Sequence, residues 1–143
     1  MNRQFIEAFN LKCAKFIGYE WLDDFNYPEK NNIGWYDNQG MYIGKILNFH
    51  TDWNEIHKVI DFIHLIRIRV PDYNVIEWFS VDVTSNICTI TSGLRNADGE
   101  TKTPYYYSEY NYDINNKNAV ILSLNNFIDW FNENKEQWKK NIL

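Results

Sequence analysis

The chain has 143 residues, the length of one domain, so we expect residues 1–143 to fold as a single domain. Its formal net charge of −5 argues against non-specific nucleic-acid binding and against adhesion to an anionic membrane, since both require a basic surface. No apolar run is long enough to span a membrane, and charges at Arg3 and Glu7 come too early for a signal peptide. We therefore expect a cytoplasmic protein with no membrane contact.

The first predicted element is a helix over residues 2–17, which Gly18 ends. Its apolar residues recur every three or four positions and form one stripe: Phe5, Ile6, Phe9, Cys13, Phe16 and Ile17. The polar stretch 23–32 is predicted to be a surface loop. Aromatic residues on both sides of the turn-forming sequence 37–40 then predict a β-hairpin over residues 33–43.

A second helix is predicted from Thr51 to about Arg69. Thr51 is the type of residue that caps helix N-termini, and Trp53 begins an apolar stripe expected to lie in the core. Pro71 prevents the helix from continuing, because proline has no backbone N–H and clashes with the preceding turn.

Residues 75–83 alternate between apolar and polar, and residues 87–91 form the returning strand of a second hairpin. The last helix covers residues 117–139, with Asn115 or Asn116 as its N-cap. This order of elements predicts the α+β class: a small, mostly antiparallel sheet with about three helices packed on it.

The three histidines offer no shared metal site. His50, His57 and His64 are seven residues apart, so consecutive rings on a helix are separated by about 10.5 Å, whereas metal ligands lie about 2 Å from a common ion. Cys13 and Cys88 belong to no C-x-x-C pair and are expected to be small buried side chains. Motifs for a serine nucleophile, a phosphate-binding loop and a dinucleotide are absent. We expect no metal, no cofactor and no catalytic residues.

The aromatic content of 17% is the clearest positive signal, because five tyrosines lie between Pro104 and Asp113. Strand alternation places Tyr106, Tyr110 and Tyr112 on one face and Tyr105 and Tyr107 on the other. Tyrosine supplies a large contact area at low entropic cost, so the segment is either an edge strand whose rings cover the sheet or a binding surface. In the second interpretation Tyr105, Tyr107 and Tyr110 contact the partner.

His50 and Trp53 are further candidate binding residues, at the predicted entry to the second helix. His50 either stabilises the turn there or contacts a ligand. If His50 lay in a pocket beside a carboxylate, the chain would instead be a small enzyme with an unrecognised active site near His50.

Residues Phe49 to Ile63 resemble a YHTSWDWLMPVVEKI-type motif of uncharacterised small proteins from Bacteroidota and their phages. His50, Thr51, Trp53 and Val59 match it, whereas Glu55 and Lys58 stand where that family has Trp and Pro. The N-x-C-x-I strand of the family resembles residues 86–90, and its closing helix resembles residues 119–134. The resemblance covers about half of the chain and implies a phage or mobile-element context without implying an activity.

These observations predict a non-catalytic binding protein, encoded by a phage or mobile element, that binds or inhibits a host protein or sequesters a small ligand. The expected partner is a host protein or a second copy in a homodimer, because the chain is acidic and rich in tyrosine. A small nucleotide is the alternative ligand, but it requires cations that converge on phosphate. The candidates for that role are Arg67, Arg69, Arg95 and Lys102.

Overall fold

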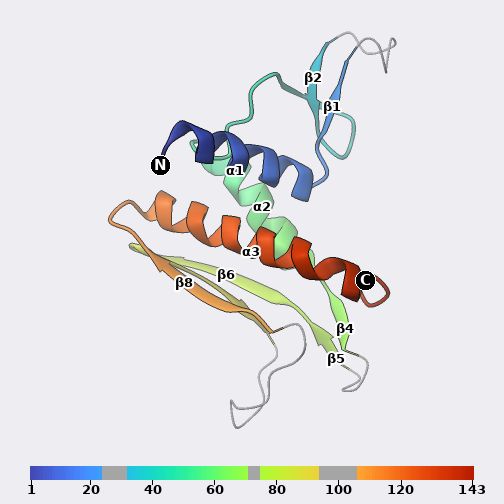
Figure 1. Ribbon diagram of the computed structural model, residues 1–143, viewed down its shortest axis with the longest axis vertical. Helices are drawn as coiled ribbons and strands as arrows, with labels where there is room; N and C mark the ends of the chain where they lie inside the picture. The colour runs from blue at the N-terminus through green and yellow to red at the C-terminus, as the bar shows by residue number, and fades with distance from the viewer. Residues whose placement is uncertain (24–31, 71–74, 94–105) are drawn as a thin grey trace. The chain divides into compact units, whose positions relative to one another are not determined.

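The computed structural model describes residues 1–23, 32–70, 75–93 and 106–143 (Figure 1). The chain divides into two compact units, Met1–Val59 and Ile60–Leu143, and the boundary falls within one helix. Three helices and three small antiparallel sheets are present in the described ranges, which confirms the predicted α+β class. The predicted single domain over residues 1–143 stays a prediction.

The first unit begins with helix α1 (Arg3–Phe16), as the apolar stripe predicted. The Asn2 side chain caps it by accepting a hydrogen bond of 2.8 Å from the Phe5 N–H. Gly18 follows with φ of 87°, a conformation that favours glycine, and turns the chain away from the helix.

A three-stranded sheet follows, formed by β1 (Glu20–Leu22), β2 (Gly34–Tyr36) and β3 (Tyr42–Gly44). The predicted hairpin is β2–β3, and the Asp37 carboxylate organises its turn by accepting hydrogen bonds from the N–H groups of Gln39 and Met41 at 2.9 and 2.8 Å. Strand β1 was not predicted, because three residues are too few for a recognisable alternation.

Helix α2 (Trp53–Leu65) begins one residue later than a helix capped by Thr51 would, and the residue in the cap position is Asp52. The Asp52 carboxylate accepts a hydrogen bond of 2.8 Å from the Asn54 N–H, and the Asp52 carbonyl accepts the first helical bond from Ile56. The Thr51 hydroxyl donates instead to the Asn48 carbonyl, at 3.4 Å. The prediction for Thr51 was wrong because an acidic side chain at the next position satisfies the free N–H and also suits the helix dipole.

Replacing Asp52 with Ala is expected to lower the free energy of unfolding by about 1 kcal/mol, because a free N–H of the first helical turn loses its acceptor. Thr51→Ala is the matched neighbour and should cost less, since its hydroxyl bonds to the Asn48 carbonyl before the helix. Urea unfolding of the two variants measures this difference. Equal losses, or a larger loss for Thr51→Ala, would contradict the assignment of the cap.

The end of α2 also differs from the prediction, because Ile68–Val70 is strand β4 and not the last helical turn. Ile68 and Val70 are buried and Arg69 between them is exposed, so β-branched alternation prevails over helical spacing here. One edge of β4 pairs with β5 (Val75–Glu77). The other edge of β4 contacts the C-terminal residues of the chain. There the Arg69 N–H donates to the Asn141 carbonyl at 2.7 Å, and Ile68 forms a β-bridge with Ile142.

The second unit also contains the sheet β6 (Phe79–Thr84), β7 (Ile87–Ser92) and β8 (Ser108–Tyr112), in that order. Helix α3 (Asn116–Trp138), with Asn115 as its N-cap, lies over one face of this sheet (Figure 1). Its buried side chains include Val120, Leu124 and Phe127. Within the ranges that the structure describes, none of the helices is both long and apolar enough to cross a membrane.

Candidate functional site

The sheet β6–β7–β8 has one face against α3 and a second face, here called the outer face, that points away from it. Asn111 and Glu109 point toward the helix, because they bond to Ser123 and Asn126 of α3 at 3.0 and 2.6 Å. The alternate residues of β8 and their cross-strand partners therefore share the outer face. The outer face consists of Ser80, Asp82, Thr84, Ile87, Thr89, Thr91, Ser108, Tyr110 and Tyr112.

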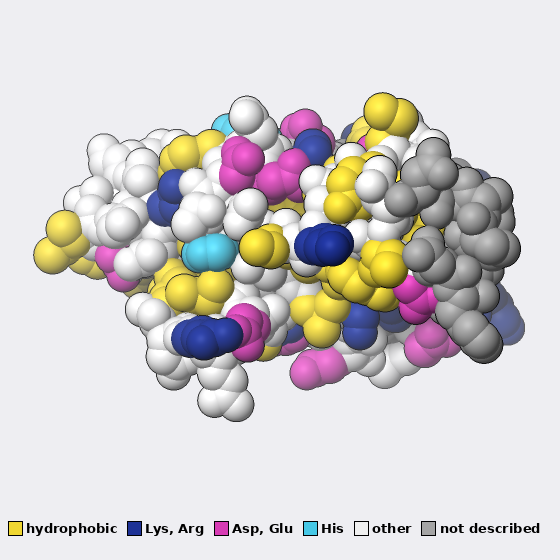
Figure 2. Space-filling model, turned by 90° about the horizontal axis from the view of Figure 1, so that it is seen from above, with side chains coloured by type: hydrophobic (Ala, Val, Ile, Leu, Met, Phe, Trp, Pro, Cys, Tyr) yellow, Lys and Arg dark blue, Asp and Glu magenta, His cyan; other side chains and the backbone are white. Residues whose placement is uncertain are grey.

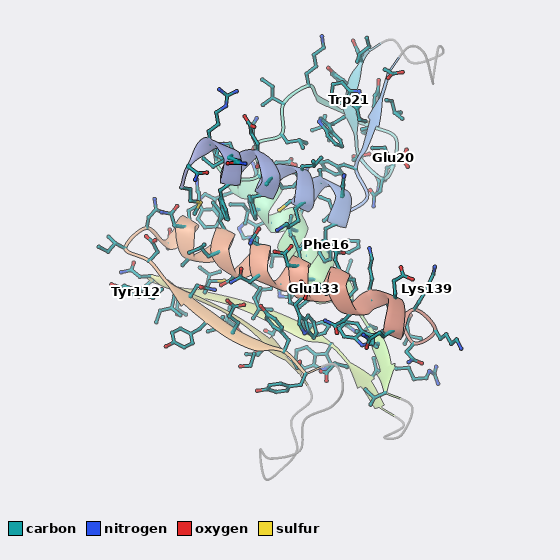
Figure 3. The ribbon with its side chains drawn as sticks, in the orientation of Figure 1. Phe16, Glu20, Trp21, Tyr112, Glu133 and Lys139 are labelled. Atoms are coloured by element: carbon teal, nitrogen blue, oxygen red, sulfur yellow. The ribbon has the colours of Figure 1, made fainter. Side chains whose placement is uncertain are left out.

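Two tyrosine rings dominate the outer face. Tyr110 is 71% exposed and Tyr112 is 61% exposed, and Figure 3 labels Tyr112 on β8. The shared face of Tyr110 and Tyr112 is as the sequence predicted. The remaining outer-face side chains are mostly hydroxyls, and the only charge among them is Asp82, which accepts a hydrogen bond of 3.1 Å from the Ser80 hydroxyl. Sequence reasoning had not grouped Ile87 and Thr89 with these tyrosines, because strand alternation does not give the register between strands.

Tyr107 lies on the opposite side from Tyr110 and is buried, with 9% exposed. Its ring contacts Trp130 and Phe127 of α3, at centroid distances of 4.7 and 5.2 Å. The proposed role of Tyr107 in a binding surface was therefore wrong, because these two aromatic residues of α3 enclose its ring. Tyr105, the other candidate on that face, lies outside the described residues.

The Glu109 carboxylate connects β8 to α3. It accepts hydrogen bonds from the Tyr107 hydroxyl, from the Asn111 amide at 3.1 Å and from the Asn126 amide at 2.6 Å. The Asn111 amide also donates to the Ser123 hydroxyl, which in turn donates to the Cys88 carbonyl of β7 at 3.2 Å. This network fixes β8 to both β7 and α3, so the outer face has a rigid support.

Replacing Tyr107 with Phe is expected to lower the free energy of unfolding by about 1–2 kcal/mol near neutral pH, because Glu109 loses a donor. Burial, followed by the hydrogen bond and charge of Glu109, raises the pKa of Tyr107 above its ordinary value. This stabilisation is fully present below the unfolded pKa of about 10 and is lost as pH rises above it, because only the unfolded tyrosine then ionises. Urea unfolding from pH 7 to 11 should show the wild type approaching the variant. A constant difference over this range would contradict the assignment.

His50 is held by Asn10 of α1, and both residues belong to the first unit. The Asn10 amide donates to the Leu47 carbonyl at 2.9 Å, its oxygen accepts from the His50 N–H at 3.1 Å, and its Nδ2 lies 2.9 Å from His50 Nδ1. Asn10 itself is buried. The buried amide therefore fixes both the loop before α2 and the orientation of the half-buried His50 ring.

His50 also lines an open cleft of about 600 Å³ in this unit. The wall of the cleft is formed by Arg3, Ile6, Glu7, Asn10, Leu11, Trp35, Lys45, Ile46 and Leu47. The carboxylate in this lining, Glu7, accepts a 2.7 Å hydrogen bond from the exposed Arg3, and the hydrogen bonds of the His50 ring are to an amide. Among the described residues of this cleft, His50 is therefore paired with an amide and Glu7 with an arginine, and the alternative of an enzyme near His50 stays a prediction.

Trp53 is half-buried and does not lie in the core, contrary to the prediction. As the first residue of α2 it packs beside the exposed His57 ring, with the ring centroids 6.1 Å apart. The fully buried side chains of the helix begin at Ile56.

Figure 2 shows one surface of the molecule, on which apolar side chains are scattered among acidic and basic ones.

The two cysteine thiols and the possible metal ligands are further candidates for reactive or binding groups among the described residues. Cys13 and Cys88 are both free thiols and both buried, as predicted, and burial raises the pKa of each above its ordinary value, which disfavours the reactive thiolate. No group of three or more His, Cys, Asp or Glu side chains in the described ranges is arranged to hold a metal ion.

Comparison of the chain with protein-family models, with curated proteins and with solved structures finds no match. The resemblance of residues Phe49 to Ile63 to the motif of Bacteroidota and phage proteins stays a prediction.

Proposed function

We propose that the chain is a non-catalytic binding protein that attaches to a basic surface of another protein through the outer face of β6–β7–β8. The observation that carries this proposal is the exposure of Tyr110 and Tyr112 on a face whose other side is fixed to α3. In the phage or mobile-element context that the sequence resemblance implies, the target is a host protein whose basic surface is blocked by the contact.

The side chains of the outer face suit a protein partner. Tyrosine rings bury a large area on contact while losing few rotamers, and serine and threonine hydroxyls both donate and accept hydrogen bonds. The side chains stand on paired strands instead of a loop, so little backbone entropy is lost on binding. These properties favour a specific, preorganised contact.

The charge of the outer face indicates the chemistry of the partner. Asp82 is its only ionised side chain, it carries no Lys or Arg, and the whole chain has a net charge of −5. A basic partner surface is attracted to such a face, whereas nucleic acid and other acidic surfaces are repelled. The association should therefore weaken as salt concentration rises.

The variant Thr89→Lys tests this proposal. Thr89 lies at the centre of the outer face between Asp82 and Tyr110, so a lysine there opposes a basic partner and offsets the single acid. Wild-type protein immobilised in a lysate of the cell in which it acts should retain a partner that salt releases. Thr89→Lys should lose that partner, and the matched variant Met41→Lys, at a 65% exposed position of the first unit, should keep it. Equal retention by both variants would contradict the proposal.

A second candidate function, sequestration of a small ligand, is favoured by the cleft beside His50. Its volume of about 600 Å³ is within the range of small-molecule sites. Thermal-shift measurement against a nucleotide library tests it: a stabilisation that His50→Ala removes would support this function, and no stabilisation by any nucleotide would reject nucleotide sequestration.

A further inference from the structure

The outer edge of β8 is unpaired in the part of the chain that the structure describes. β7 pairs with one edge of β8, through bonds such as Ser92 N–H to Tyr107 carbonyl at 2.8 Å and Asp113 N–H to Asn86 carbonyl at 3.0 Å. Bonding direction alternates along an antiparallel strand, so the odd-numbered residues of β8 face β7. The N–H and carbonyl groups of Ser108, Tyr110 and Tyr112 therefore point away from the sheet.

The opposite edge of the same sheet is protected. The N–H of Val81 in β6 donates to His64 Nε2 of α2 at 3.1 Å, so a side chain occupies the position that a further strand would need. Both residues belong to the second unit. The two edges differ, and β8 is the one on which another strand can be added.

β8 also lacks two of the features that keep an edge strand from pairing, a proline and a lysine. Its sequence, Ser-Glu-Tyr-Asn-Tyr, contains no proline and no lysine, and its register with β7 is continuous over five residues. Its one charged side chain, Glu109, is bonded to Tyr107, Asn111 and Asn126 on the α3 side. The edge therefore presents an uninterrupted row of backbone donors and acceptors.

We infer that the occupant of this edge is a second copy of β8, paired antiparallel about a two-fold axis at Tyr110. The two three-stranded sheets then form one six-stranded sheet. The outward-pointing groups of Tyr110 bond to those of Tyr110 in the second copy, and Ser108 pairs with Tyr112 of the second copy. The row of three outward-pointing residues is symmetric about its middle, so it is complementary to itself.

Charge selects this register over its neighbours. In the register centred on Tyr110, Glu109 lies opposite Asn111 of the second copy. A shift in one direction places Glu109 opposite Glu109, and a shift in the other places Glu109 opposite Asp113. Both shifts oppose like charges, which destabilises a cross-strand pair. Only the register about Tyr110 pairs every residue of β8 without such repulsion.

This dimer does not depend on the proposed function, but it would extend it. Joining two sheets edge to edge continues the outer face across the axis and brings the tyrosines of both copies onto one surface. A partner with a repeated or two-fold basic surface would then meet two copies of the face at once, which increases avidity without new contacts in either copy.

Charged variants at Tyr110 test the dimer. Tyr110→Lys places two lysines opposite each other at the axis, and Tyr110→Glu places two glutamates there. Neither substitution removes a backbone hydrogen bond to β7. Circular dichroism checks that both variants fold. Sedimentation should show the wild type as a dimer and each variant alone as a monomer. The dimer Kd of each variant should be at least about 30-fold higher than that of the wild type. An equimolar mixture of the two variants should recover a dimer, because opposite charges then face each other.

Thr89→Lys is the matched control, because it adds the same charge to the same face on the central strand, away from the edge. It should remain a dimer while losing the basic protein partner, so failure of the dimer and failure of the proposed function are distinguished. A monomeric wild type, a dimeric Tyr110→Lys, or a mixture that stays monomeric would each overturn the inference.

Discussion

Replacing Phe127 with Ala is expected to lower the free energy of unfolding of the second unit by about 3–5 kcal/mol, because it leaves a large cavity at the centre of an aromatic cluster. Phe127 is fully buried, and its ring lies 5.1 Å from Phe79, 5.2 Å from Tyr107 and 5.6 Å from Trp130, measured between centroids. This cluster joins α3 to the sheet, so its loss also loosens the support of the outer face. Urea unfolding, followed by circular dichroism, measures the change.

The control for Phe127→Ala is Ile114→Ala, which removes an apolar side chain that is 85% exposed just before α3. Its effect should stay within about 0.5 kcal/mol. A loss below about 1 kcal/mol for Phe127→Ala would mean that α3 does not rely on this cluster, and the account of a rigid outer face would fail with it.

Replacing Asn10 with Ala is expected to cost about 2–4 kcal/mol, because it removes the donor of the Leu47 carbonyl and the acceptor of the His50 N–H together. The bonds cross from α1 to the loop before α2, so the loop should also open more often. Two measurements check this: urea unfolding of the variant, and the rate of trypsin cleavage after the exposed Lys45.

Gln4→Ala is the matched control for Asn10→Ala, because Gln4 is an exposed position of the same helix. It should leave both stability and cleavage nearly unchanged. If Asn10→Ala resembled Gln4→Ala in both measurements, the loop would be held by other contacts, and the orientation of His50 would not depend on Asn10.

The longer elements could be predicted from the sequence because their apolar patterns repeat several times. Helix α1 and the hairpin β2–β3 agree closely with the prediction, and Asn115 caps α3 as one of two expected alternatives. The strand predicted over residues 75–83 is instead two strands, β5 and β6, which belong to different sheets, and only β6 forms the hairpin with β7. Residues 66–69 were wrongly assigned to the helix, because Ile66, Ile68 and Val70 fit a strand while the residues before them fit a helix. Local spacing could not decide between the two.

The binding surface could be predicted only in part. Alternation correctly placed Tyr110 and Tyr112 together, but it could not show that α3 would cover Tyr107 with Phe127 and Trp130, because that contact joins segments about twenty residues apart. The link between Asn10 and His50 spans forty residues and leaves no pattern in the sequence. The sequence could not show that Asp52, and not the neighbouring Thr51, caps α2, because both residue types favour the cap position and they differ by only one place in the chain.

The central claim is that a protein partner rests on the outer face, and site-specific photo-crosslinking tests it most directly. A photo-reactive residue in place of Thr89 lies in the middle of the outer face on the central strand, and an adduct with a second copy of the chain is told from one with another protein by its mass. The same residue in place of the exposed Met41 serves as the control. The account predicts an adduct with one heterologous basic protein from position 89 and none from position 41. No adduct at position 89, or the same adducts at both positions, would contradict it.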